Sequence, residues 1–235
     1  MSNLSYMQKA TDRGQLQIHV TTERGFFPIK DASIRLSYTG NPTEIIEELS
    51  TDISGQTAAV ELPAPPLEYS MEPSEFQPYS EYTIQVNASG YRPINISGIS
   101  VLPDKTSIQN VRMETATVEN PLERNIVITA NTLYGNFPPK IPEDEIKPMT
   151  ESGEIVLSRV VIPEYVIVHD GPPSDSSAND YYVRYRDYIK NVASSEIYAT
   201  WPDAALRANI LAIMSFTLNR VYTEWYRNKG YNFTI

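Results

Sequence analysis

The sequence has no cysteine and only two histidines, His19 and His169, among its 235 residues. The lack of thiols excludes disulfides and thiolate metal sites. The two histidines do not have the close spacing of zinc ligands, so we predict neither a metal nor another cofactor. Basic residues are also scarce, since 19 Lys and Arg face 29 Asp and Glu and leave a net charge of -10. This balance argues against nucleic acid and against an anionic membrane surface as partners.

Long apolar runs are missing as well. The first ten residues lack the apolar stretch of a secretory signal, and no segment has the length of a transmembrane helix. Residues 1–12 are polar and predict a flexible arm. With 41% hydrophobic residues the chain can form a core, and its length suits one large domain or two small ones.

Short alternating segments fill residues 13–115. In the first of them Leu16, Ile18 and Val20 alternate with polar residues, which is typical of a half-buried strand. Further strands are predicted at residues 32–38, 59–62, 82–88, 99–102 and 108–113. About seven short strands with turn residues between them predict an antiparallel β-sandwich.

Four pieces of this region resemble the carboxypeptidase regulatory-like, transthyretin-like domain. They are Gly14-x-Leu16-x-Ile18-x-Val20, the Pro28-Ile29-x-x-Ala32 pair, the Thr51-Asp52-x-x-Gly55 turn and Tyr82-x-Ile84-x-Val86-x-Ala88-x-Gly90-Tyr91. The resemblance implies a sandwich that positions or shields a neighbouring domain and performs no chemistry of its own.

The pattern weakens over residues 116–153. Residues 126–128 could form an isolated strand, whereas the region from Phe137 onward is rich in proline and charge and predicts an extended linker. An exposed linker between two packed units is a preferred site of proteolysis, so an activating protease is one expected partner. A mere tether fits the composition equally well.

Residues 154–235 predict a second, α/β domain. Two β-branched runs, residues 154–157 and 165–168, predict strands. A short helix is expected from about Tyr185 to near Glu196. The chain as a whole is therefore expected to be α+β.

A long helix follows. We expect Thr200 to cap it, with Asp203 closing a capping box and Pro202 in the first turn. Apolar residues recur at helical spacing and also fill the other faces, which predicts a helix buried on all sides. Because the sequence ends at Ile235, we expect sequence beyond this residue to cover it.

Residues 187–196 and 201–208, Asp-Tyr-Ile-Lys-Asn-Val-Ala-Ser-Ser-Glu and Trp-Pro-Asp-Ala-Ala-Leu-Arg-Ala, resemble the core motif of the stage II sporulation protein D family. Those proteins are peptidoglycan lytic transglycosylases. The order of sandwich, proline-rich linker and motif resembles the pro-form of spore cortex-lytic enzymes of the SleC type. The resemblance implies that the protein is located in the spore. It also implies that the substrate is the glycan strands of peptidoglycan.

In that family the glutamate of the motif is the catalytic acid/base, and its match here is Glu196. The same residue protonates the leaving oxygen and then deprotonates the muramyl 6-hydroxyl, so a second carboxylate is not required. We expect Tyr198 and Trp201 to enclose this carboxyl and to contact sugar faces. The family often has Arg-Thr-Tyr where this chain has Met214-Ser215-Phe216, so any polar role at those positions is not carried over.

Other readings of these residues stay open. A glutamate at a helix end is commonly a solvated surface residue, Trp201 could simply pack in the core, and Asp203 suits a helix cap better than a second acid. The main alternative function is a non-catalytic wall-binding or structural scaffold. A third possibility is that the sandwich inhibits the enzyme until residues 137–152 are cut.

Overall fold

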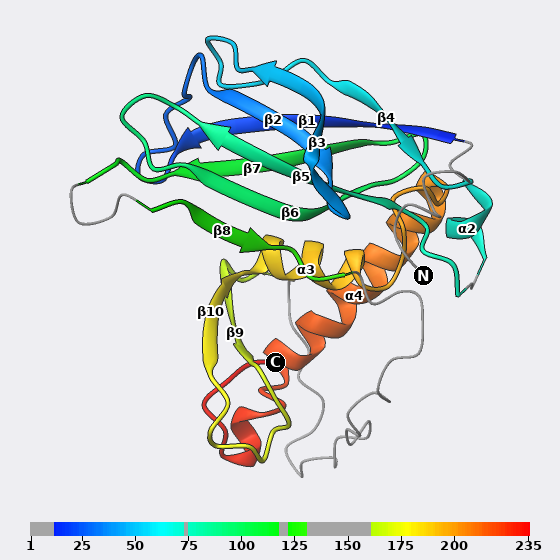
Figure 1. Ribbon diagram of the computed structural model, residues 1–235. Coiled ribbons are helices and arrows are strands. Elements are labelled where there is room, and N and C mark those ends of the chain that lie inside the picture. The colour runs from blue at the N-terminus through cyan, green and yellow to red at the C-terminus, as the bar shows by residue number, and fades with distance from the viewer. Residues whose placement is uncertain (1–11, 73–74, 118–121, 131–160) are drawn as a thin grey trace. The chain divides into compact units, whose positions relative to one another are not determined.

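The computed structural model describes residues 12–72, 75–117, 122–130 and 161–235 (Figure 1). The chain divides into two compact units, Met1–Gly135 and Asn136–Ile235. The first is built mainly of β-strands and the second mainly of helices. Within the described residues, no helix is long and apolar enough to cross a membrane.

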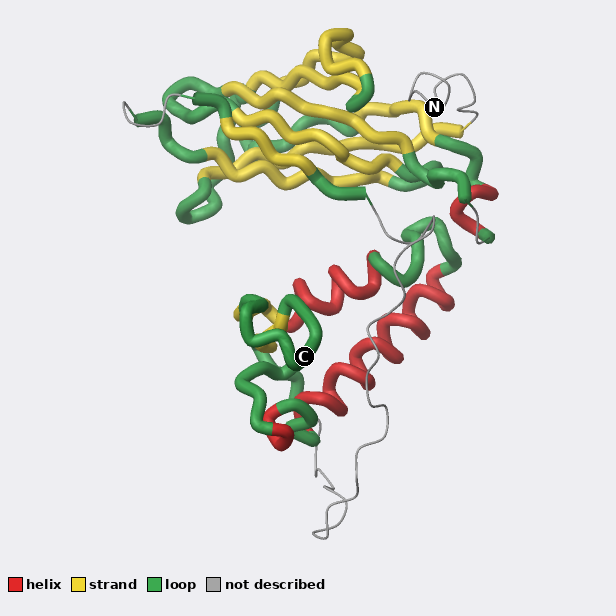
Figure 2. The backbone as a smooth tube through the Cα atoms, turned by 60° about the horizontal axis from the view of Figure 1, so that its bottom comes forward, coloured by secondary structure: helices red, strands yellow, loops and turns green. Residues whose placement is uncertain are grey.

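Two sheets form the first unit, whose strands are yellow in Figure 2. The three-stranded sheet has the order β4-β1-β7, and the five-stranded sheet has the order β3-β2-β5-β6-β8. The strands are β1 (Asp12–Thr22), β2 (Ser33–Tyr38), β3 (Asn41–Ser50), β4 (Val60–Ala64), β5 (Ser80–Asn87), β6 (Ile94–Val101), β7 (Thr106–Met113) and β8 (Arg124–Val127). One four-residue helix, α2 (Glu68–Met71), follows β4.

The core of this unit lies between its two sheets, as the alternating pattern predicts. Leu16 and Ile18 of β1 are fully buried and belong to one cluster with Leu36 and Ile84 of the five-stranded sheet. Tyr82 of the same sheet is also fully buried, and its hydroxyl donates to the carbonyl of Pro63 in β4 at 2.7 Å. The unit is therefore a β-sandwich, and this prediction is confirmed.

The predicted turn at Asp52 and Gly55 is also confirmed. Asp52 Oδ1 accepts hydrogen bonds from the backbone nitrogens of Ser54 (2.9 Å) and Gln56 (3.0 Å). The side-chain hydroxyl of Ser54 also donates to Asp52 Oδ1. This bond is the largest cause that holds the pKa of the Asp52 carboxyl below its ordinary value, and the two backbone bonds add to it. Gly55 takes a left-handed φ of 74°, which a glycine adopts without a steric penalty.

The expectation of a purely antiparallel sandwich is wrong at two places. Strand β1 runs parallel to β7, from Gln15 opposite Thr106 to Thr22 opposite Met113. Strand β8 runs parallel to β6, so it is part of the five-stranded sheet and not an isolated strand in a linker. Alternation predicts which face of a strand is buried, but it does not reveal the direction of the neighbouring strand.

Sequence patterning missed β3 because this strand is at an edge of the sheet and its residues are exposed or half-buried. It carries Pro42 and three glutamates, Glu44, Glu47 and Glu48. Charges and proline are common on edge strands, where they prevent pairing with other molecules. They also remove the alternation on which the prediction depends.

Three other predictions fall on residues that lie outside the described ranges. These are the arm predicted at residues 1–12, the strand at residues 154–157 and the proline-rich part of the linker from Phe137 to residue 153. Asp12 alone of the predicted arm is described, and it is the first residue of β1. All three otherwise remain predictions.

The second unit pairs a β-hairpin with two helices. Strand β9 (Tyr165–His169) is antiparallel to β10 (Asp180–Arg184), which leads directly into α3 (Tyr185–Ser194). Helix α4 (Asp203–Tyr222) and the 3-10 helix η1 (Arg227–Lys229) follow. The predicted strand at 165–168 and the short helix from Tyr185 are thus confirmed, whereas β10 was not predicted.

The core of this unit joins these elements. Val166, Tyr185, Ile189 and Ile213 form one buried cluster, and a second consists of Trp225, Tyr226 and Phe233. The last residues of the sequence lie along β9, since the backbone nitrogen of Thr234 donates to the carbonyl of Ile167 at 2.9 Å.

The residues of this chain bury α4 on one face only, and the expectation that further sequence covers its other faces stays a prediction. Only Ile213, Thr217 and Arg220 are buried, while Leu211 is 63% and Phe216 54% exposed. The buried residues follow one helical stripe, so the helix packs on one face although its sequence is apolar around most of its circumference. The hydroxyl of Thr217 is satisfied within the helix, where it donates to the carbonyl of Ile213 at 2.9 Å.

The start of α4 also differs from the prediction. The N-cap residue is Pro202, whose carbonyl accepts from the nitrogens of Ala205 (2.9 Å) and Leu206 (3.1 Å), and Asp203 is the first helical residue. The capping box from Thr200 therefore places the start too early. The acidic side chain of Asp203 still lies in the first turn, where the helix dipole favours negative charge.

Candidate functional site

The connection between α3 and α4 contains all three residues predicted for the site, Glu196, Tyr198 and Trp201. It is a series of tight turns, because the nitrogens of Glu196 and Ile197 both donate to the carbonyl of Ala193 at 3.1 Å. The nitrogen of Trp201 donates to the carbonyl of Tyr198 at 3.1 Å. Ile197 is only 8% exposed and anchors the connection to the unit. Backbone bonds thus fix the position from which Glu196 projects.

Glu196 itself is exposed. The Nδ2 atom of Asn209 donates to its Oε2 atom at 3.2 Å, which ties the connection to α4. The expected enclosure of this carboxyl among aromatic rings is not seen, since Tyr198 and Trp201 are half-buried while the carboxylate projects to the surface. The structure keeps the three predicted residues together on one connection but does not bury the acid.

Asn209 is a residue that the sequence analysis missed. It lies on the stripe of α4 that includes Ile213 and Thr217, four and eight residues later, and it is half-buried. Its Oδ1 atom is buried and has no hydrogen-bond partner among the described residues. The signal that could have revealed Asn209 is its spacing of four and eight residues from Ile213 and Thr217, which puts a polar amide on the buried stripe of the helix.

Neither Glu196 nor Tyr198 nor Trp201 lines either of two pockets formed by described residues. One lies in the first unit, measures about 440 Å³ and has polar walls that include the ion pair between Arg13 and Glu61. The other lies in the second unit at the end of α4 and measures about 130 Å³. Groups of three or more metal-ligating side chains do not occur within the described part of the chain.

His169 occupies a constrained position on β9. Its side chain is 7% exposed, and its ring stacks on Phe233 with 4.4 Å between the ring centroids. Nδ1 is 2.8 Å from Oδ1 of Asp180, and Nε2 is 3.1 Å from the carbonyl oxygen of Pro172. Both partners are acceptors, so both bonds are made only when the ring is protonated.

We therefore expect the second unit to lose stability as the pH rises. The hydrogen bond to Asp180 is the largest cause that raises the pKa of His169 above its ordinary value of 6.5, and partial desolvation opposes it. The stabilisation is fully present below the ordinary pKa and is lost as the pH rises through the raised pKa. The other charged group that faces the ring is Asp175, whose own pKa is lowered, chiefly by the hydrogen bond from Ser177.

An NMR titration measures this directly, because the chain has only two histidines. We expect His169 to titrate above the ordinary pKa of 6.5, with His19 resolved in the same spectra. Asp180→Asn should lower the pKa of His169 and leave the signal of His19 unchanged. A pKa of His169 at or below 6.5 in the unaltered chain would show that the two hydrogen bonds are not made in solution.

Comparisons with known proteins find similarity only at the level of solved structures. No family model matches the chain, and no curated protein matches its sequence. The Bacillus anthracis TIE protein is 17% identical over 45% of this chain and 17% of its own, with a TM-score of 0.31. The minor pilin GBS52 of Streptococcus agalactiae is 13% identical over 57% of this chain and 49% of its own, with a TM-score of 0.31.

A third similar structure is the 5-hydroxyisourate hydrolase of Klebsiella pneumoniae. It is 16% identical over 44% of this chain and 92% of its own, with a TM-score of 0.29. The chain spans less than half the length of the first two proteins.

Proposed function

We propose that this chain carries the acid/base residue of a peptidoglycan lytic transglycosylase, and that Glu196 is this residue. The observation that supports the proposal best is the hydrogen bond from Asn209 Nδ2 to Glu196 Oε2, at 3.2 Å. It holds one oxygen of the carboxylate and leaves the other directed to the surface, where a polymeric substrate has access. In this proposal the second unit is the N-terminal part of a stage II sporulation protein D-like domain, and the sandwich is of the carboxypeptidase regulatory-like, transthyretin-like type.

The proposed reaction needs no water. The protonated carboxyl of Glu196 gives its proton to the oxygen that links N-acetylmuramic acid to N-acetylglucosamine, and the bond from the muramyl C1 to this oxygen breaks. The carboxylate then takes the proton of the muramyl 6-hydroxyl as O6 bonds to C1. One proton is given and one is recovered, so a single carboxylate completes the cycle.

The exposure of Glu196 sets a condition on this mechanism. The first step needs the neutral carboxylic acid, because only this form has a proton to give. A glycan strand bound along the connection would cover the side chain, and removal from water disfavours its charged form. Tyr198 and Trp201 could supply the aromatic faces that hold such a strand. Binding and protonation are therefore coupled in this proposal.

The same exposure favours a second candidate function, a non-catalytic scaffold that binds the cell wall. Incubation of the full-length gene product with purified spore-cortex peptidoglycan distinguishes the two. Lytic activity releases muropeptides that end in 1,6-anhydro-muramic acid, whereas a scaffold sediments with the glycan and releases none. The proposal also places the protein in the spore cortex or coat region, with a protease acting at the linker as activator.

A further inference from the structure

Asn209 keeps one buried polar atom without a hydrogen-bond partner. Its Oδ1 atom is buried and unpaired among the described residues, whereas its Nδ2 atom donates to Oε2 of Glu196 at 3.2 Å. Buried polar atoms are nearly always paired, so an unpaired one is a cost that calls for an explanation. The chain accepts this cost at a position from which the other end of the amide reaches Glu196.

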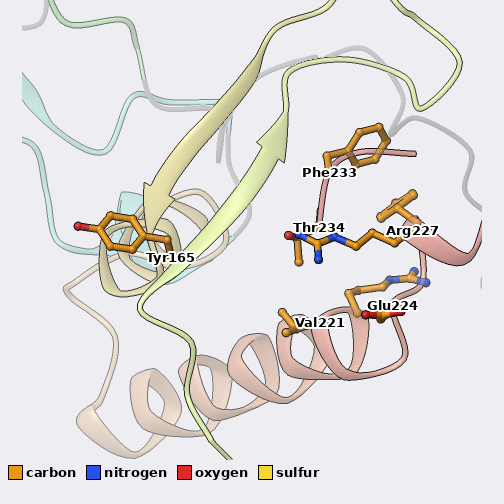
Figure 3. A pocket seen from close by; sticks show the side chains of 8 residues that line it. Tyr165, Val221, Glu224, Arg227, Phe233 and Thr234 are labelled. Carbon is orange, nitrogen blue, oxygen red and sulfur yellow. The ribbon is translucent and has the colours of Figure 1, made fainter. Parts of the chain in front are cut away.

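Packing alone does not require an amide at this position. Ile213 and Thr217 continue the same stripe of α4 and are buried, and the hydroxyl of Thr217 is satisfied by the carbonyl of Ile213 at 2.9 Å. A leucine at position 209 would fill nearly the same volume without an unpaired atom. The pocket at the far end of α4 does not use Asn209 either, because Figure 3 shows its walls around Val221 and Glu224. The contact with Glu196 is therefore what the amide contributes.

Both side chains project from backbone that is fixed. Asn209 belongs to α4, and the nitrogens of Glu196 and Ile197 both donate to the carbonyl of Ala193 at 3.1 Å. Within the described part of the chain Glu196 belongs to no ion pair, so no charged side chain competes with the amide for its carboxylate. The hydrogen bond from Asn209 thus sets how the two oxygens of the carboxyl group are oriented.

The direction of this hydrogen bond also determines where a proton on Glu196 can reside. Protonation of Oε1 leaves the bond from Nδ2 to Oε2 intact, whereas protonation of Oε2 sets a second donor beside Nδ2. A reversed amide would turn Oδ1 toward Oε2, so two acceptors would face each other whenever Glu196 is ionised. The neutral carboxyl therefore carries its proton on Oε1, the oxygen that is directed to the surface.

We propose that Asn209 is the positioning residue of Glu196 and assigns the exchangeable proton to Oε1, a role that rests on the proposed lytic function. In the first step the proton on Oε1 passes to the glycosidic oxygen as the bond from the muramyl C1 to that oxygen breaks. In the second step Oε1 takes the proton of the 6-hydroxyl as O6 bonds to C1. Oε2 stays bound to Asn209 throughout, so the same oxygen faces the glycan in both steps.

Two substitutions of Asn209 test this role in the full-length gene product. Asn209→Leu keeps the volume but removes the donor, so we expect the kcat for release of anhydro-muropeptides to fall about 10–100-fold with KM unchanged. Its Tm should stay the same or rise, because the unpaired Oδ1 atom is lost as well. Asn209→Asp keeps the shape but places an acceptor against Oε2, so its kcat should fall at least as far at neutral pH.

Asn209→Asp also separates a donor from a mere packing role. Acid that protonates the new side chain restores an O–H donor beside Oε2. Relative to the unaltered protein at the same pH, we expect the activity of Asn209→Asp to recover about tenfold or more as the pH is lowered. Asn209→Leu should show no such recovery. The same pH profile in the two variants would show that Asn209 only packs.

An NMR measurement on the 235-residue chain tests the contact apart from activity. Glu196→Gln replaces a charged acceptor by a neutral one, so the side-chain NH2 signals of Asn209 should shift, whereas Glu164→Gln should leave them in place. Signals of Asn209 that do not respond to Glu196→Gln would overturn its role, whatever the activity.

The activity measurements distinguish this role from the proposed function. Full kcat in Asn209→Leu, together with an inactive Glu196→Gln, would overturn the role of Asn209 and leave the lytic function in place. An unaltered protein that releases no anhydro-muropeptides would refute the lytic function, and the role of Asn209 with it, even where the NMR contact is seen.

Discussion

Glu196→Gln is expected to lower the release of anhydro-muropeptides by about 10²–10⁴-fold, the usual contribution of a general acid/base. Glutamine has nearly the same size and can still accept the hydrogen bond from Asn209 at its Oε1 atom. It can neither give a proton to the glycosidic oxygen nor take one from the 6-hydroxyl. The loss should therefore appear in kcat, because the surface that contacts the glycan is unchanged.

The matched control is Glu164→Gln, which removes another exposed carboxylate of the same unit. Its activity should equal that of the unaltered protein, and both variants should have the same Tm within about 1 °C. Activity is measured in the full-length gene product with cortex peptidoglycan as substrate. If Glu196→Gln released anhydro-muropeptides at the normal rate, Glu196 would have no part in the chemistry.

Gly98→Ala is expected to destabilise the sandwich by about 2–5 kcal/mol, whereas Gly90→Ala should cost only about 1–2 kcal/mol. Both glycines have φ of 82°. At Gly90 an added methyl group meets nothing within 4 Å, so only the left-handed backbone is penalised. At Gly98 the methyl group would overlap the carbonyl oxygen of Ile128, just beyond β8. The difference between the two therefore measures how closely β8 packs on β6.

The two units can be followed separately in one urea titration. Both tryptophans, Trp201 and Trp225, belong to the second unit, so their fluorescence reports on that unit. The backbone amide signals of β6 in NMR spectra report on the sandwich. Gly98→Ala should move the urea midpoint of these signals and leave the fluorescence midpoint unchanged. Equal effects of the two glycine substitutions would mean that β8 is not packed against β6.

The parts of the fold that could be predicted are those that a local pattern determines. Alternation of Leu16, Ile18 and Val20 predicted the buried face of β1, and the apolar spacing after Tyr185 predicted α3. The strands that were missed, β3 and β10, have mostly exposed residues. Without a buried face they lack the alternation by which a strand is recognised.

The buried stripe of α4 could not be predicted without knowing which residues pack against the helix. The sequence is apolar around the helix, so it could not show that Leu211 and Phe216 are exposed while Arg220 is buried. Arg220 is buried because aromatic rings cover its guanidinium, and those rings come from beyond the end of the helix. Such a contact is not visible in helical periodicity.

The candidate site could be predicted only in part, because contacts between residues far apart in sequence are not visible in a local pattern. The motif located Glu196, Tyr198 and Trp201 on one connection, because they are near in sequence. The contact with Asn209 spans 13 residues and depends on how α4 packs beside α3. The left-handed φ of Glu224 could not be predicted either, because it contradicts the usual residue preference for this conformation.

The most direct test of the proposed chemistry is digestion of cortex peptidoglycan by the full-length gene product in water enriched in oxygen-18. A transglycosylase closes the muramyl ring with its own 6-hydroxyl, so the new muramyl ends should contain no oxygen-18 and should be lighter by one water than hydrolysed ends. Muramyl ends that carry oxygen-18 at C1 would show hydrolysis and would contradict the account. Glycan that is bound but never cut would contradict it as well, in favour of a scaffold.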